Sequence, residues 1–109
     1  MAEPTLQEVF GAAAVQDANT LTISKADLAA TGLTPSANNK AESLLVALIQ
    51  LARVQLTPTN QETNADQSIT LEDSFDSIVS RNNQNYRQKT ISLNLQKLDT
   101  ANTINPNDY

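Results

Sequence analysis

The chain has no cysteine, no histidine and no tryptophan, and only two of its 109 residues are glycine. Without cysteine and histidine it can form neither disulfides nor the usual zinc sites, and it lacks the base that most often activates a serine or threonine nucleophile. Gly11 and Gly32 lie too far apart to build a glycine-rich phosphate-binding loop. These absences predict a protein that is not an enzyme and that carries no cofactor.

Aromatic residues make up only 4% of the chain, and much of its 39% apolar content is alanine. Because alanine buries little surface, a domain of this size gains less free energy than usual from its core. Oligomerisation is the common remaining support for a small domain without disulfides or a structural metal. The composition therefore favours a homo-oligomer or a subunit of a larger complex.

The formal net charge is −5, and charged residues are only 17% of the chain. Phosphate backbones repel an acidic surface, so we expect no nucleic acid partner. No apolar run approaches the roughly 20 residues that span a bilayer, and the first residues lack the basic region of a signal peptide. The sequence predicts an intracellular or virion protein that is neither secreted through a signal peptide nor inserted in a membrane.

Few side chains remain that could support catalysis. Ser24 and Lys25 are adjacent, and neighbours on a helix do not face each other; Ser24 is better explained as a helix cap. Glu72, Asp73 and Asp76 form the one dense acidic group, and we interpret it as a strand edge or a helix start rather than an acid–base pair. No catalytic residue is predicted.

A metal site is suggested only by the loop at residues 60–66. Its alternating oxygen-bearing side chains resemble the first half of a calcium loop and are Asn60, Glu62, Asn64 and Asp66. Ala65 then stands where the turn needs glycine, and Leu71 stands where such loops have a bidentate glutamate. We predict a polar loop without metal, with a weak calcium site as the alternative.

Three helices are predicted, over about residues 6–15, 25–30 and 40–56. The first follows a capping box at Thr5–Glu8, and the second ends at Gly32. The third follows a possible capping box at Asn39–Glu42 and ends before Pro58, after which residues 57–67 are predicted to be a loop. Its apolar residues cover about twice the arc of an ordinary amphipathic helix, so we expect cover on two sides.

The predicted strands are at about 20–23, 68–80 and 86–97, and the last two form a β-hairpin. The apolar residues of both strands fall on one face if the pairs are Val79 with Arg87, Phe75 with Ile91 and Leu71 with Leu95. This register requires a connection of three or five residues, in which an Asn adopts the left-handed conformation. Residues 74–81 also fit a helix capped by Asp73, which is the alternative.

Basic residues gather on the second strand, around Tyr86, while the first strand carries the acidic group. The basic residues are Arg81, Arg87, Lys89 and Lys97. Cross-strand or intermolecular charge pairing explains this segregation without a nucleic acid.

Together these patterns predict a single α+β domain over residues 1–97, with two or three helices on a small antiparallel sheet, followed by an extended arm at 98–109. We expect a structural or assembly protein that acts through subunit contacts; its general character resembles that of small bacteriophage virion components, although no motif identifies a family. The alternative is a soluble adaptor or regulatory domain that binds a protein through the hairpin face. The residues predicted for protein contact are Val54, Leu56, Tyr86, Arg87, Lys89, Ile104 and Tyr109.

Overall fold

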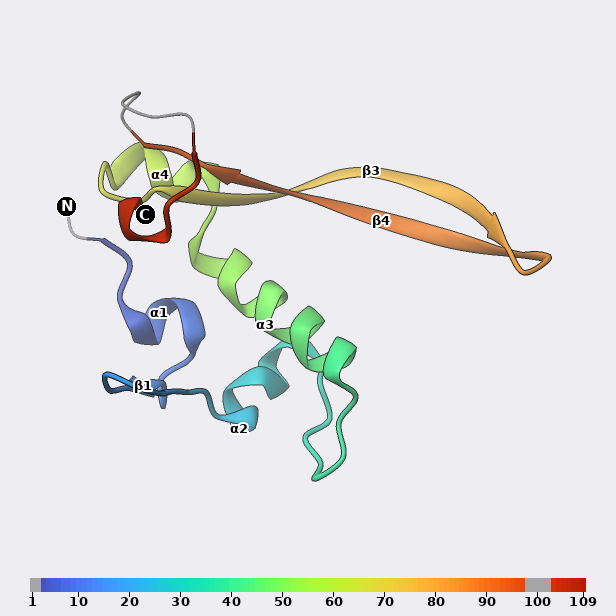
Figure 1. Cartoon of the computed structure of the whole chain (residues 1–109), viewed down its shortest axis with the longest axis horizontal. Coiled ribbons are helices and arrows are strands. Elements are labelled where there is room, and N and C mark those ends of the chain that lie inside the picture. Colours follow the sequence, from blue (N-terminus) through green and yellow to red (C-terminus); the bar gives the residue numbers. More distant parts are fainter. Residues whose placement is uncertain (1–2, 98–102) are drawn as a thin grey trace.

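The structure, a computed structural model, describes residues 3–97 and 103–109 and confirms the α+β class. The elements are α1 (Leu6–Phe10), β1 (Val15–Gln16), β2 (Leu21–Thr22), α2 (Lys25–Leu28), α3 (Ala41–Gln55), α4 (Pro58–Thr63), β3 (Ile69–Arg81) and β4 (Gln84–Leu95), with short 3-10 helices at Ala29–Thr31 and Pro106–Asp108. Figure 1 shows the helices gathered at one end of the molecule, from which the β3–β4 hairpin projects.

Helix α1 begins at the predicted capping box but is shorter than predicted. The Thr5 amide donates to Glu8 Oε1 at 2.9 Å, and the Glu8 amide donates to Thr5 Oγ1 at 3.1 Å. The helix ends at Phe10 because Gly11 has a φ of 106°, which a helix cannot continue through. Beyond it, Val15–Gln16 pairs with Leu21–Thr22. The predicted strand at 20–23 therefore exists, but it belongs to its own two-stranded sheet and not to that of the hairpin.

The second predicted helix is present as α2 and the 3-10 helix that follows it. Ser24 caps α2 by accepting a hydrogen bond from the Ala26 amide at 3.2 Å, and Gly32 ends the 3-10 helix in the left-handed conformation. Ser24 thus has the structural role that the sequence indicated. Its neighbour Lys25 donates to the Ser36 carbonyl at 2.8 Å.

Helix α3 has the predicted extent, although the capping box at Asn39 does not form. Lys40 is the N-cap and its side chain makes no capping bond, while Asn39 instead closes the preceding turn by donating to the Thr34 carbonyl at 3.0 Å. The helix packs mainly on α1 and less on α2, the 3-10 helix and β3. Leu45 and Val54 remain more than half exposed, so residues 3–97 and 103–109 do not supply the two-sided cover that we predicted.

Residues 58–63 form helix α4, so the prediction of a loop over 57–67 is wrong. Thr57 accepts a hydrogen bond from the Asn60 amide at 3.0 Å, and Pro58 occupies the first helical position, where its missing N–H costs nothing. Residues two apart on a helix point to nearly opposite sides, so Asn60 and Glu62 diverge. Asn60 donates to the Gln55 carbonyl at 2.8 Å. The alternating oxygens are therefore not arranged as a calcium loop.

The hairpin is present and the helical alternative for residues 74–81 is wrong. Its connection has two residues, Asn82 and Asn83, both with positive φ, rather than the three or five predicted. The two asparagines suit a tight turn whose twist matches that of the strands. The register also differs: Leu71 lies opposite Leu93, not Leu95.

A β-bulge reconciles the tight turn with the alignment of the apolar residues. Asp73 pairs with Ile91 and Asp76 pairs with Lys89, so two residues of β3, Ser74 and Phe75, oppose the single residue 90 of β4. Without this extra residue, the two-residue turn would place the apolar positions of β3 and β4 on opposite faces of the sheet. The bulge keeps them on one face at the base of the hairpin.

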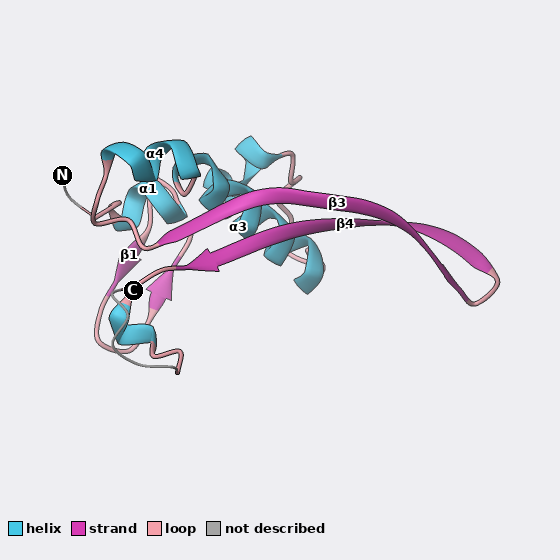
Figure 2. Ribbon diagram, turned by 90° about the horizontal axis from the view of Figure 1, so that it is seen from above, coloured by secondary structure: helices cyan, strands magenta, loops and turns pink. Residues whose placement is uncertain are grey.

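The buried core is small and lies among the helices. Within residues 3–97 and 103–109, the buried apolar side chains are Ala14, Leu28, Ala47 and Leu56. The hairpin is joined to this core at its base, where the Leu71 amide donates to the Leu56 carbonyl at 2.8 Å. In both Figure 1 and Figure 2 the distal half of the hairpin extends beyond the helices. The predicted packing of helices on the sheet is therefore confined to the start of β3.

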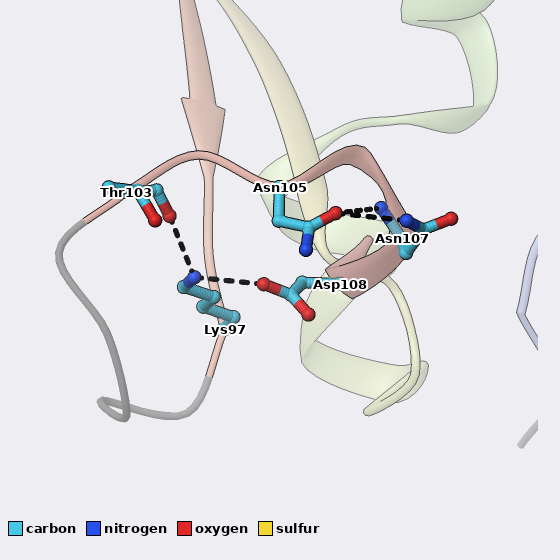
Figure 3. A network of polar contacts seen from close by, with 5 residues as sticks. All are labelled: Lys97, Thr103, Asn105, Asn107 and Asp108. Carbon is cyan, nitrogen blue, oxygen red and sulfur yellow. Dashed lines mark hydrogen bonds and ion pairs between the residues drawn. The ribbon is translucent and has the colours of Figure 1, made fainter.

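The last residues return to the base of the hairpin. Residues 98–102 of the predicted arm lie outside the described residues. In the remainder, Lys97 Nζ donates to the Thr103 carbonyl and to Asp108 Oδ2, both at 2.9 Å, and Asn105 caps the 3-10 helix by accepting from the Asn107 amide (Figure 3). The described end of the arm is thus bonded to its own chain.

Candidate functional site

The β3–β4 register divides the hairpin into two faces of different character. Cross-strand partners share a face, and faces alternate along each strand. One face carries a set of exposed aliphatic side chains, which we call the apolar row and which consists of Ile78, Ile91, Leu93 and Leu95. Ile78 is 59% exposed and Leu93 is 57% exposed. An alternating pattern of this kind normally marks a buried strand face, and here the chain leaves it open.

The opposite face is largely polar. At its base the Asn94 side chain donates to Thr70 Oγ1 at 3.2 Å and to Glu72 Oε2 at 3.1 Å, and Thr70 is only 3% exposed. Further out, Ser77 pairs with Gln88. This face is covered where the hairpin leaves the body and can be solvated along the rest of its length. Only the face of the apolar row lacks a partner suited to its chemistry.

Among the described residues, Phe75 is the most exposed of the large apolar side chains, at 84%. It lies in the bulge, where the extra residue breaks the alternation and can redirect a side chain away from the sheet. A fully solvated phenylalanine at a bulge has no evident role in the stability of the isolated chain. The β4 residue that it opposes, Thr90, belongs to the polar face of the hairpin.

Charges on the hairpin are paired across the strands in part, as predicted. Lys89 Nζ lies 3.0 Å from Asp76 Oδ2, on the same face as the apolar row. Asp73 instead pairs with Arg53 of α3 at 2.7 Å, and Arg81 lies over the Tyr86 ring, 4.1 Å from its centroid. Residues 74–91 hold three basic side chains and one acidic one, a formal charge of +2 on a chain whose net charge is −5.

The residues predicted for protein contact do not form one surface. Leu56 is buried in the core, and Val54 is exposed on α3. Ile104 is exposed and Tyr109 is half-buried near the base of the hairpin. The remaining three, Tyr86, Arg87 and Lys89, all lie on β4 beyond the helices, and Arg87 and Lys89 share the face of the apolar row.

Sequence reasoning missed Phe75, Ile78 and Leu93 as surface residues. The alternation of Leu93 with its neighbours on β4 was visible, and we predicted that helices pack on this sheet. Ile78 is out of step with Leu71 and Phe75 in the sequence, and it shares the face of Leu93 because of the bulge. The sequence does contain a signal that these residues are exposed, which is the shortage of helical residues that could cover the strands. Helices α1, α2 and α4 together are too short to cover the thirteen residues of β3.

Two hollows on the body offer little chemistry. One, of about 660 Å³, lies beside the base of the hairpin and is lined by polar side chains that include Gln61, Gln67 and Lys97. Lys97 is already neutralised there by Asp108. The other, of about 750 Å³, lies between α3 and residues 31–34 and is lined by Val46, Ala47 and neighbouring polar groups.

No group of three or more acidic side chains in the described parts of the chain is arranged to hold a metal ion. Among these same residues, no helix has the length and hydropathy needed to cross a membrane. The chain matches no protein-family model and is significantly similar to no curated protein and to no solved structure. The projecting hairpin with its apolar row is therefore the candidate functional site on the strength of its geometry.

Proposed function

We propose that this chain is a non-enzymatic structural protein that works inside an assembly, as small bacteriophage virion components do, and that the β3–β4 hairpin is its contact element. The observation that carries the proposal is the apolar row, which lies on a hairpin that extends beyond the helices and leaves Leu93 and Ile78 more than half exposed. A two-stranded hairpin on its own is marginally stable in water, so a partner that covers one face also stabilises the element.

The small core supports the same proposal. Few apolar side chains are buried in the described residues, and α3 keeps Leu45 and Val54 exposed. A chain with this little buried apolar surface gains much of its stability when it binds its neighbours.

The second candidate is a soluble adaptor domain that binds one regulatory partner through the same hairpin face. The positive distal half of the hairpin favours it, because a single acidic partner would be attracted there. An adaptor would exchange between free and bound forms, whereas an assembly subunit would remain in a particle of fixed size.

The proposal is tested by the size of the protein in the organism that makes it. We expect tagged wild-type protein to migrate in a complex well above its own 11.8 kDa on native gels and size-exclusion chromatography. I78S/L93S should migrate as the monomer, because it removes two members of the apolar row, while S77A/Q88A on the polar face should behave as wild type. Migration of all three as monomers would contradict the proposed function.

A further inference from the structure

We propose that the apolar row packs face to face against the same row of a second copy, with the two hairpins side by side and their tips pointing the same way. The proposal rests on the proposed assembly function and names the partner as this chain itself. Two sheets packed in this manner bury both inner faces at a separation of about 10 Å.

The choice of face follows from burial. At the base of the hairpin the polar face is already covered, with Thr70 3% exposed, whereas Leu93 on the other face is 57% exposed. On this face Leu93 and Ile78 are more than half exposed, and Ile91 and Leu95 are each 36% exposed. The Asp76–Lys89 pair lies between Ile91 and Ile78. A second hairpin has the length to cover this row.

The choice of a second copy follows from charge. On the face of the apolar row, the acidic side chains Asp73 and Asp76 lie on β3 and the basic side chains Arg87 and Lys89 lie on β4. A two-fold axis parallel to the strands, between the two faces, places β3 of one copy over β4 of the other. Asp76 of one copy then lies over Lys89 of the other, in addition to its own cross-strand Lys89, whereas Asp73, which is paired with Arg53, lies over Ile91.

The same axis matches the apolar residues. Leu71 and Leu93 are cross-strand partners, so Leu93 of one copy lies over Leu71 of the other. A pair with tips pointing in opposite directions would instead place β3 over β3, with acidic side chains facing acidic ones. Like charges in such positions are unfavourable, which selects the parallel arrangement.

The area of the hairpin face determines the affinity that we expect between two copies. A strand of 12 residues spans about 40 Å and a two-stranded sheet is about 10 Å wide, so the footprint is roughly 400 Å². Stable interfaces bury about 800 Å² on each partner, so the hairpin pair alone should form a dimer that depends on concentration. The exposed stems of Arg87 and Lys89 add to the contact.

A charge-reversal pair tests the proposal on purified full-length protein. D76K places two basic side chains at one level of the hairpin, and K89D places two acidic ones there. Each variant alone should self-associate at least about tenfold more weakly than wild type, since like charges meet across the two-fold axis and a tenfold change needs only about 1.4 kcal/mol. A 1:1 mixture should form the mixed dimer, which native mass spectrometry distinguishes by mass.

Recovery of dimerisation in the mixture would show that the charges act between two copies. Mixing cannot restore the Asp76–Lys89 ion pair within either chain, so loss of that pair alone would leave the mixture as weak as each variant. I78D, on the face of the apolar row, should abolish the dimer, and S77D beside it should not. Circular dichroism of each variant checks that the hairpin is folded.

Two outcomes would overturn the proposal. If the wild type stays monomeric at millimolar concentration and the two variants form no mixed dimer, self-pairing is excluded. In that case a large complex in the native organism would still support the proposed function, with another protein as the partner. Self-association that D76K strengthens would instead indicate a head-to-tail contact between the basic hairpin of one copy and the acidic body of the next.

Discussion

At the scale of single residues, Gly11 decides where the first helix ends. Its φ and ψ of 106° and 156° lie in a region that is essentially restricted to glycine, and a Cβ there would lie 2.6 Å from Asp27 Cβ. Asp27 Oδ2 accepts a hydrogen bond from the Ala13 amide at 3.0 Å, so the aspartate cannot move without losing that bond.

We expect Gly11→Ala to lower the free energy of unfolding by about 3 kcal/mol, since backbone strain and the clash with Asp27 act together. Gly32→Ala is the matched control: its φ is 105°, but no heavy atom lies within 4 Å of the added Cβ. It should cost only about 1–2 kcal/mol from the left-handed backbone. Urea denaturation measures both values, and equal losses would argue against the contact with Asp27.

The Asp17 carboxylate makes the stability of the β1–β2 turn depend on pH. Its carboxylate accepts hydrogen bonds from the Asn19 and Thr20 amides, both at 2.8 Å, and these bonds lower the pKa of Asp17 below its ordinary value. A lowered folded-state pKa means that the stabilisation is present above about pH 4 and is lost as the pH falls through the folded pKa. Titration of the Asp17 carboxyl by NMR should give a midpoint below the ordinary value of an aspartate, and Asp17→Asn should remove the acid-induced change in the Asn19 and Thr20 amide signals. A midpoint at or above the ordinary value would contradict this assignment.

At the scale of elements, α4 connects the helical body to the hairpin. Thr57 caps it, and Gln67 ties its start to β3 by donating to the Thr57 and Ile69 carbonyls at 3.0 and 2.9 Å. The orientation of the hairpin therefore depends on a short helix whose first turn relies on one hydroxyl.

Thr57→Ala should lower the free energy of unfolding by about 1 kcal/mol and raise the hydrogen-exchange rates of the α4 amides, because the Asn60 amide loses its acceptor. Thr59→Ala, at an exposed position inside the same helix, should be neutral or slightly stabilising. Equal effects of the two changes would show that the cap does not matter.

Local signals predicted most elements, and their failures have local causes as well. The capping box at Thr5, the glycine at position 32 and the apolar spacing of residues 41–55 each act within a few residues, so they could be seen in the sequence. Thr57–Pro58 was misread because the same pair that ends α3 also begins α4, with proline at the first helical position. The turn length was missed because the bulge at Ser74 and Phe75 shifts the register by one residue, and nothing in the local sequence marks it.

At the scale of the whole molecule, sequence could not reveal what covers the hairpin. Alternation along β3 and β4 shows that one face is apolar, but the same pattern serves a face covered by the chain's own helices and a face covered by another chain. Ile78 and Leu93 are 59% and 57% exposed, so the described part of the chain leaves both side chains largely uncovered, although Leu93 lies at the base of the hairpin opposite Leu71. The segregation of charge is visible in the sequence, and the structure adds that the basic segment 74–91 forms the distal part of the hairpin.

The most direct test of the hairpin as a contact surface uses the absence of native cysteine. I78C lies on the face of the apolar row and S77C on the polar face of the same strand, so each thiol reports one side of the hairpin. In the native assembly we predict that I78C reacts with a thiol reagent at least about tenfold more slowly than S77C, as expected for a side chain buried in a contact. In denaturant the two should react at similar rates. Equal and unhindered labelling of both cysteines in the native assembly would contradict the role of this hairpin.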